Sequence, residues 1–180
     1  DNSVRAATQM MMFVALDKAG ERRQAALNAI TSIDTAMAEL NDPAALSRYF
    51  TIARDGNIEV QYAPFEFINP NARVVLVGIT PGRTQMVNAL RECRRQLQAG
   101  ASTDVALKAA KNTGAFSGAM RPNLTALMDA VGLNRWLGLS SCEGLFGSAA
   151  HLVQTTSVLR NPVFINGENY NGTPRMTTHP

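Results

Sequence analysis

The sequence is poor in the residues that build metal centres. It contains two cysteines among 180 residues, Cys93 and Cys142, and no CxxC pair. This excludes a zinc site made of four cysteines and an iron–sulfur cluster held by four thiolates. We therefore expect a protein with no metal and no cofactor, whose thiols stay reduced in the cytoplasm.

Charge and long apolar runs are scarce as well. Charged residues make up 17% of the chain, and the formal net charge is +3. No stretch approaches the roughly 20 apolar residues that cross a bilayer, so no membrane association is expected. Apolar residues reach 46%, enough for one globular domain with a core. The weak positive charge permits contact with a polyanion without requiring it.

The chain begins with Asp1 rather than methionine, and the run Met10-Met11-Met12 is more typical of a natural start. We interpret residues 1–11 as a tag or disordered leader and residues 12–180 as a single domain, truncated at its C-terminus.

Apolar periodicity and turn residues predict five helices and three strands. The helices are expected over residues 21–40, 43–49, 84–98, 102–111 and 122–132, and the strands over 58–62, 74–77 and 152–158. The alternation in 58–62 is that of an exposed antiparallel edge strand. The unbroken β-branched run 74–77 is typical of a central parallel strand covered on both faces. Residues 160–172 are rich in turn formers, and we expect no further strand–helix unit after them.

Three segments carry polar or glycine-rich chemistry. The turn Gly78-Ile79-Thr80-Pro81-Gly82-Arg83 lies between a strand and a helix, so backbone amides could hold a phosphate or polar ligand. It is neither a Walker loop nor GxGxxG, and the alternative is a tight turn with glycines for geometry. Phe116 is a large ring in a polar loop, or else a core aromatic. Thr155-Thr156-Ser157 places three hydroxyls at the end of a strand.

In this order the three segments resemble the uracil-DNA glycosylase superfamily. Residues 78–83 are similar to its first catalytic motif, residues 114–119 to its phenylalanine loop, and residues 155–162 to the strand and exit loop that carry a base-reading Asn. The resemblance spans roughly residues 73–173. With the element order, it implies an α/β fold, a three-layer α/β/α sandwich with a short, mainly parallel sheet.

The resemblance also implies roles for individual residues. Thr80 and Gln85 would position the attacking water, although Gln85 could equally be a solvated helix residue. Thr80 stands where the family commonly has Asp, Glu or Asn, and a hydroxyl can orient water but cannot act as a carboxylate base. The flipped base would stack on Phe116. The remaining base- and DNA-binding positions would be Gly78, Ile79, Pro81, Gly82, Arg83, Thr156 and Ser157.

Thr156 replaces the base-reading Asn with a shorter side chain, which leaves more room. We therefore hypothesise that the protein hydrolyses the N-glycosidic bond of uracil or, in preference, of a modified pyrimidine such as a hypermodified cytosine of phage DNA. The role would be DNA repair or antiviral defence. A monomer acting on single- or double-stranded DNA is expected.

Two other functions remain open at this stage. The first is a catalytically inactive DNA-binding module of the same fold, suggested by Thr80 and Thr156 and by the lack of a late His motif. His179 follows residues 155–158 too closely to supply that motif. The second is a nucleoside or nucleotide hydrolase. Basic residues such as Lys111, Arg121 and Arg160 could line a DNA groove or simply be solvated.

Overall fold

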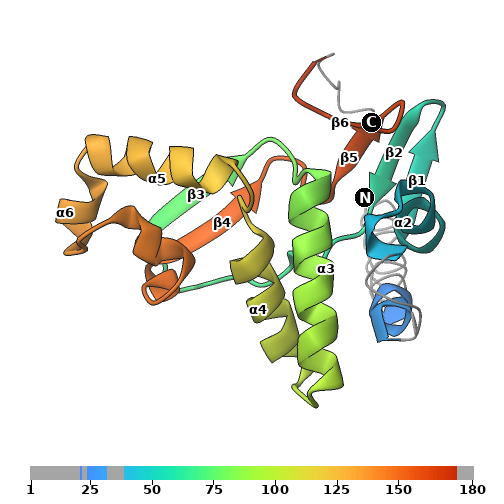
Figure 1. Cartoon of the computed structure of the whole chain (residues 1–180), viewed down its shortest axis with the longest axis horizontal. Coiled ribbons are helices and arrows are strands. Elements are labelled where there is room, and N and C mark those ends of the chain that lie inside the picture. Colours follow the sequence, from blue (N-terminus) through green and yellow to red (C-terminus); the bar gives the residue numbers. More distant parts are fainter. Residues whose placement is uncertain (1–20, 22–23, 32–38, 174–180) are drawn as a thin grey trace, which may run out of the picture.

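The computed structural model describes residues 21, 24–31 and 39–173 (Figure 1). Residues 24–31 are helical, within the helix expected over 21–40. The leader interpreted at residues 1–11 and the C-terminal His179 lie outside the described residues.

In the described chain a helix precedes three strands, four helices follow them, and three more strands come last. The helices are α2 (Pro43–Phe50), α3 (Arg83–Gln98), α4 (Thr103–Gly114), α5 (Met120–Ala130) and α6 (Leu133–Leu137), with short 3-10 turns η1 (Glu39–Asn41), η2 (Cys142–Phe146) and η3 (Ala150–Leu152). The strands are β1 (Thr51–Asp55), β2 (Ile58–Gln61), β3 (Val74–Gly78), β4 (Val153–Ser157), β5 (Val163–Ile165) and β6 (Glu168–Asn169).

Several helices lie where the periodicity predicts them. Helix α3 begins one residue before the expected start and ends at the expected residue, Gln98. Ser102 caps α4 by accepting a hydrogen bond from the Val105 amide, as the capping pattern predicts, but the helix continues three residues beyond Lys111. Asp42 likewise caps α2, which has Pro43 in its first turn.

The strands form two separate sheets. The larger has four strands in the order β1-β2-β5-β6, and every neighbouring pair is antiparallel. The smaller is the parallel pair β3 and β4. In Figure 1 these two sheets lie to either side of α3.

The expectation of a three-layer α/β/α sandwich with a mainly parallel sheet is wrong. After β4 the chain does not add another parallel strand beside β3. It turns at Pro162 and pairs Val163–Ile165 antiparallel with β2. This pairing makes β2 an inner strand of the antiparallel sheet, whereas the sequence predicts an edge strand there. A parallel neighbour in the same sheet needs a long crossover connection, and the five residues between β4 and β5 are too few for one, so the chain passes into the other sheet.

Strand β3 is covered on one face, not on both as expected. Val74 and Leu76 pack with Val153 of β4 against Met128 of α5 and neighbouring residues. On the other face Val75 and Val77 are 58% and 60% exposed. The apolar run therefore arises from a buried face and an exposed apolar face, which the sequence pattern alone cannot distinguish from a doubly covered strand.

Helices α3 and α4 pack closely at the start of the phenylalanine loop. A Cβ on Gly114 would lie 2.6 Å from the Ala89 Cβ and 2.8 Å from the Gln85 carbonyl oxygen. The small residues let the two backbones approach, and this approach fixes where the chain leaves α4. The larger core surrounds this contact, with Met86, Leu90 and Leu107 buried in it.

Within the described residues, we find no helix that is both long and apolar enough to cross a membrane.

The β1–β2 hairpin holds a carboxylate that is tied to several donors. Glu59 accepts hydrogen bonds from Thr51 Oγ1, from Gln61 Nε2 at 2.7 Å and from Arg54 at 3.0 Å. Partial burial disfavours the charged carboxylate, but the hydrogen bonds and the Arg54 charge outweigh it. The pKa of Glu59 is lowered from 4.5 to about 2.

This network predicts an acid-dependent loss of stability. Because the pKa of Glu59 is lower in the folded chain, its ionised form stabilises the fold above pH 4.5, and that contribution is lost as the pH falls toward 2. We expect E59Q to be less stable than the unsubstituted protein at pH 7, with the difference shrinking between pH 4.5 and 2. Urea unfolding at several pH values measures the free energy of unfolding of both proteins. A stability difference between them that does not change with pH would contradict the role of Glu59.

Candidate functional site

The site is built where the parallel pair ends. Gly78 lies opposite Ser157 in the register of β3 and β4. The segments that follow β3 and β4 remain paired beyond the strands. The Val158 amide donates to the Gly78 carbonyl and the Leu159 amide to the Ile79 carbonyl, both at 2.9 Å. The glycine turn and the loop after β4 therefore leave the sheet together.

The hydroxyl of Thr80 closes this paired segment. It donates to the Asn161 carbonyl at 2.9 Å and accepts the Val163 amide at 3.2 Å. The same loop bonds to the antiparallel sheet, since the Gln61 amide donates to the Pro162 carbonyl at 2.9 Å. The observed bonds of Thr80 are those of a structural link, and its role in placing water stays a prediction.

The ring of Phe116 lies against the end of β3. A Cβ on Gly78 would be 3.5 Å from the Phe116 ring and 3.3 Å from the Ser157 hydroxyl. Phe116 itself has a positive φ of 54°. A bulky residue rarely adopts this conformation, which costs about 1–3 kcal/mol and persists only where the surrounding structure imposes it.

Two neighbours hold the phenylalanine loop in this conformation. Arg121 donates to the carbonyls of Asn112, Thr113 and Ala115, and its guanidinium lies 4.5 Å from the centre of the Phe146 ring. The Asn88 amide donates to the Ser117 hydroxyl at 3.0 Å, which ties the loop to α3. Arg121, one of the basic residues considered for a DNA groove, thus stabilises the junction between α4 and the loop.

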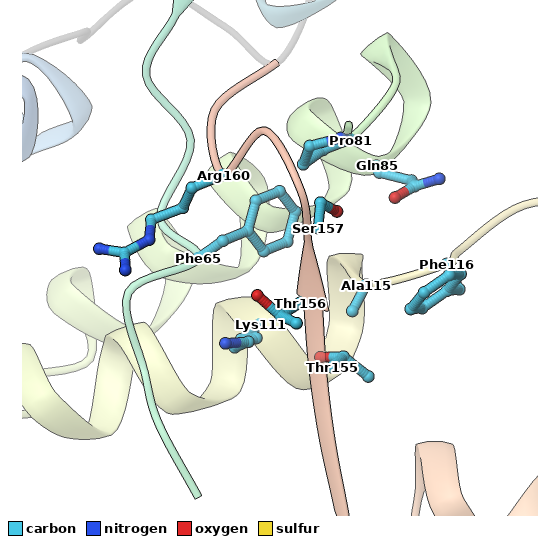
Figure 2. A pocket seen from close by; sticks show the side chains of 10 residues that line it. All are labelled: Phe65, Pro81, Gln85, Lys111, Ala115, Phe116, Thr155, Thr156, Ser157 and Arg160. Atoms are coloured by element: carbon cyan, nitrogen blue, oxygen red, sulfur yellow. The ribbon is translucent and has the colours of Figure 1, made fainter. Parts of the chain in front are cut away.

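Two hollows meet at Phe116. The first, which we call the pocket, lies at the end of β4 (Figure 2), and its volume of about 310 Å³ includes space open to solvent. Its lining is Phe65, Pro81, Gln85, Lys111, Ala115, Phe116, Thr155, Thr156, Ser157 and Arg160. The second, which we call the groove, measures about 1130 Å³ and is also open to solvent. It is lined by Gly78, Ile79, Thr80, Gly82, Thr84, Gln85, Phe116, Ser117, Met120, Ser157, Asn169, Tyr170 and Asn171.

The structure brings nearly all of the expected site residues to these two hollows. Phe116, Gln85 and Ser157 line both of them. Pro81 and Thr156 line the pocket. Four further residues of the glycine turn line the groove, namely Gly78, Ile79, Thr80 and Gly82, whereas Arg83 lines neither hollow.

Arg83 points elsewhere. Its guanidinium donates to the Gly167 carbonyl at 2.7 Å and lies 4.4 Å from the centre of the Phe164 ring. Its backbone amide, the first of α3, donates to the Asn169 side chain at 2.9 Å. Arg83 therefore joins α3 to the antiparallel sheet, and its expected contact with a phosphate stays a prediction without support from these contacts.

Thr156 and Ser157 point to opposite faces of β4, because side chains alternate along a strand. Ser157 shares its face with Gly78, whereas Thr156 is opposite Val77. Figure 2 shows Thr156 on the same side of the β4 ribbon as Lys111 and Phe65. Both still line the pocket, because the pocket wraps around the end of the strand.

The sequence did not single out Phe65, and it offered Lys111 only as one of several basic residues that could line a DNA groove or be solvated. Lys111 ends the predicted helix 102–111 as one charged residue among many, yet it is only 5% exposed. Its burial depends on residues 65–69, which run along the free edge of β4, where the Asn69 side chain donates to the Val153 carbonyl at 2.9 Å. Only the tertiary structure reveals this contact.

The chemistry available to the site is that of amides, hydroxyls and cations. The described linings of the pocket and the groove contain no carboxylate. Nor does the described part of the chain hold any group of three or more His, Cys, Asp or Glu side chains placed to bind a metal ion.

Comparison with known proteins gives one informative similarity. Over 131 residues the chain is 37% identical to the uncharacterized protein YoxB of Bacillus subtilis (strain 168). The aligned part is 72% of this chain and 51% of YoxB, so the chain spans about half the length of this relative. No family model matches the chain, and no solved structure matches it. The similarity names no activity, so the site itself must carry the functional argument.

The bonds of Thr80 lead to a stability prediction. T80V keeps the shape of the side chain but removes the donor to Asn161 and the acceptor for Val163. We expect a loss of about 1–3 kcal/mol in the free energy of unfolding, the cost of leaving such groups without partners. T80S keeps the hydroxyl and serves as the control, which should stay close to the unsubstituted protein. Equal urea midpoints for T80V and T80S would contradict the structural link.

Proposed function

We propose that this protein is a DNA glycosylase similar to the uracil-DNA glycosylase superfamily, which hydrolyses the bond between deoxyribose and uracil or a modified pyrimidine. The observation that carries the proposal is the position of the Phe116 ring, against Gly78 and between a small pocket and a large groove. An enzyme that acts on a base in DNA must extrude that base and hold it against an aromatic or apolar surface.

The linings of the two hollows support separate roles for them. The pocket places hydroxyls, an amide and two cations near the Phe116 ring, and such groups can hold the edge of a base. The groove adjoins the pocket at Phe116, Gln85 and Ser157 and would take the sugar and the neighbouring phosphates. Thr84 and Gln85 lie in the first turn of α3 and line the groove, so the positive N-terminal end of this helix lies where the backbone of DNA would pass.

The polar groups of the pocket suit the hydrogen-bonding edge of a base. The hydroxyls of Thr156 and Ser157 can rotate to donate or to accept, so they fit more than one base. Gln85, which lines both hollows, is placed to orient a water molecule next to the sugar. Because neither described lining offers a carboxylate, the reaction relies on stabilising the separating charges of sugar and base.

We further propose that the protein acts as a monomer in the cytoplasm. In support, Cys93 and Cys142 are both buried and unpaired. Burial raises the pKa of each thiol to about 11, which leaves them unreactive. Free thiols of this kind suit a reducing compartment.

A second function is favoured by one specific observation. Thr80, which stands where the family has its water-positioning residue, is bonded to Asn161 and Val163. A protein that binds an extruded base without cleaving its bond would also fit this arrangement.

The decisive experiment measures free base released from duplex and single-stranded DNA carrying uracil, hypoxanthine, or methylated, hydroxymethylated or glucosylated cytosine. We expect release from at least one uracil or modified-cytosine DNA, and release of a modified cytosine in preference to uracil would support the larger substrate. Binding of these DNAs without release of any base would favour the second function instead.

The role of Phe116 gives a matched pair of variants. F116A removes the ring that would stack on the base, and stacking contributes about 1–3 kcal/mol per base. We expect base release by F116A to fall by roughly 10- to 100-fold, in line with that free energy. F116Y keeps the ring and should retain most of the activity. Similar rates for F116A and the unsubstituted protein would show that the base is held elsewhere.

A further inference from the structure

Lys111 is a buried cation at the inner end of the pocket. It is only 5% exposed, and its ammonium group donates a hydrogen bond to the Phe67 carbonyl. It lines both the pocket and a smaller adjoining hollow next to Phe67 and Gln154. In Figure 2, Lys111 and Phe116 lie on opposite sides of the β4 ribbon, at the two ends of the pocket lining.

The ammonium of Lys111 lacks a carboxylate partner within the described residues. The ion pairs found there are Arg54–Glu59 and Glu92–Arg95. One carbonyl satisfies one of the three protons of an ammonium group. Glu66 is near enough to act on this charge but forms no ion pair with it, so a buried ammonium with unaccepted protons remains costly, and an acceptor supplied by a ligand would offset that cost.

We propose that Lys111 contacts the extruded base and stabilises the negative charge that develops on it as the glycosidic bond breaks. This inference rests on the proposed glycosylase function. The bond from the sugar carbon to the base nitrogen breaks, and its electron pair stays with the base. Water adds to the sugar carbon and releases one proton to solvent. The departed base later takes up a proton from water, and Lys111 keeps its own protons throughout.

The charged groups around Lys111 determine when it is a cation. Burial lowers its pKa most, the nearby charge of Arg160 lowers it further, and Glu66 acts in the opposite direction, which together gives a value of about 8. Lys108, one turn earlier on α4, lies 5.6 Å from the centre of the Phe67 ring and is exposed. Lys111 is therefore protonated at neutral pH and loses its charge above pH 8.

The test follows release of free base under single-turnover conditions between pH 6 and 10, on the single-stranded DNA from the panel that the unsubstituted protein cleaves fastest. We expect its rate to fall above pH 8. K111M should be slower by about 10²-fold at pH 7, the usual loss of one charge-stabilising group. Its rate should show no fall above pH 8. K111R, which keeps a charge at high pH, should recover part of the rate and remain active at pH 9.

K108M is the matched control, because it removes an exposed lysine from the same helix. It should reproduce the rate and pH profile of the unsubstituted protein. Equal rates for K111M and K108M would overturn the inference while leaving the glycosylase function in place. If K111M does not fold, a rate that stays flat through pH 8–9 in the unsubstituted protein overturns it equally. No release of any base by the unsubstituted protein would overturn both proposals.

Discussion

The junction between the two sheets is the constraint on which the site depends. The Thr80 hydroxyl bonds to Asn161 and Val163, and the neighbouring Pro162 carbonyl accepts the Gln61 amide from β2. The parallel pair and the antiparallel sheet therefore meet through a few bonds directly beside the groove. A shift of the antiparallel sheet would move the glycine turn with it, because the hydrogen bonds of Thr80 join the turn directly to the start of β5.

A second set of contacts fixes the phenylalanine loop beside the groove, as the Thr80 contacts fix the glycine turn. Gly114 lets α4 approach α3 closely, Arg121 bonds to two carbonyls of the last turn of α4 and to one in the loop, and Phe116 takes up a strained backbone conformation. Strain of this kind is offset by the bonds around it, and it fixes the ring against Gly78 before any ligand arrives. A preformed stacking surface reduces the entropy lost when a base binds.

The sequence was informative where structure is local. The helical spacing of Met86, Leu90 and Cys93 predicts α3, and Ser102 predicts the start of α4, because caps and amphipathic faces are formed by neighbouring residues. The pairing of the strands into two sheets could not be predicted from neighbouring residues. Strands β5 and β6 have only three and two residues, and β5 pairs with β2 across about a hundred residues of chain.

In the candidate site, too, the sequence predicts local features but not contacts between distant segments. The glycine turn, Phe116 and Ser157 could be proposed from short segments, and the parallel register brings them together. Lys111 could be offered only as one of several basic residues of a possible DNA groove, because a lysine near the end of a helix is normally solvated. Its burial comes from residues 65–69, which cover the open edge of β4 and have no marked pattern of their own. Burial of a single charge is a property of the assembled fold.

The contrast between Lys111 and the hydroxyls of β4 bears on how the proposed glycosylase would choose a base. Thr156 and Ser157 can each donate or accept, so they tolerate different substituents, whereas an ammonium group can only donate. In the proposed complex a base would be fixed at Lys111 by an oxygen or nitrogen acceptor, and the adaptable hydroxyls would face the edge of the base that varies. All pyrimidine bases carry a carbonyl oxygen next to the glycosidic nitrogen, and charge gathers there as the bond breaks. A donor-only cation opposite that oxygen would combine recognition of a pyrimidine with stabilisation of its departure.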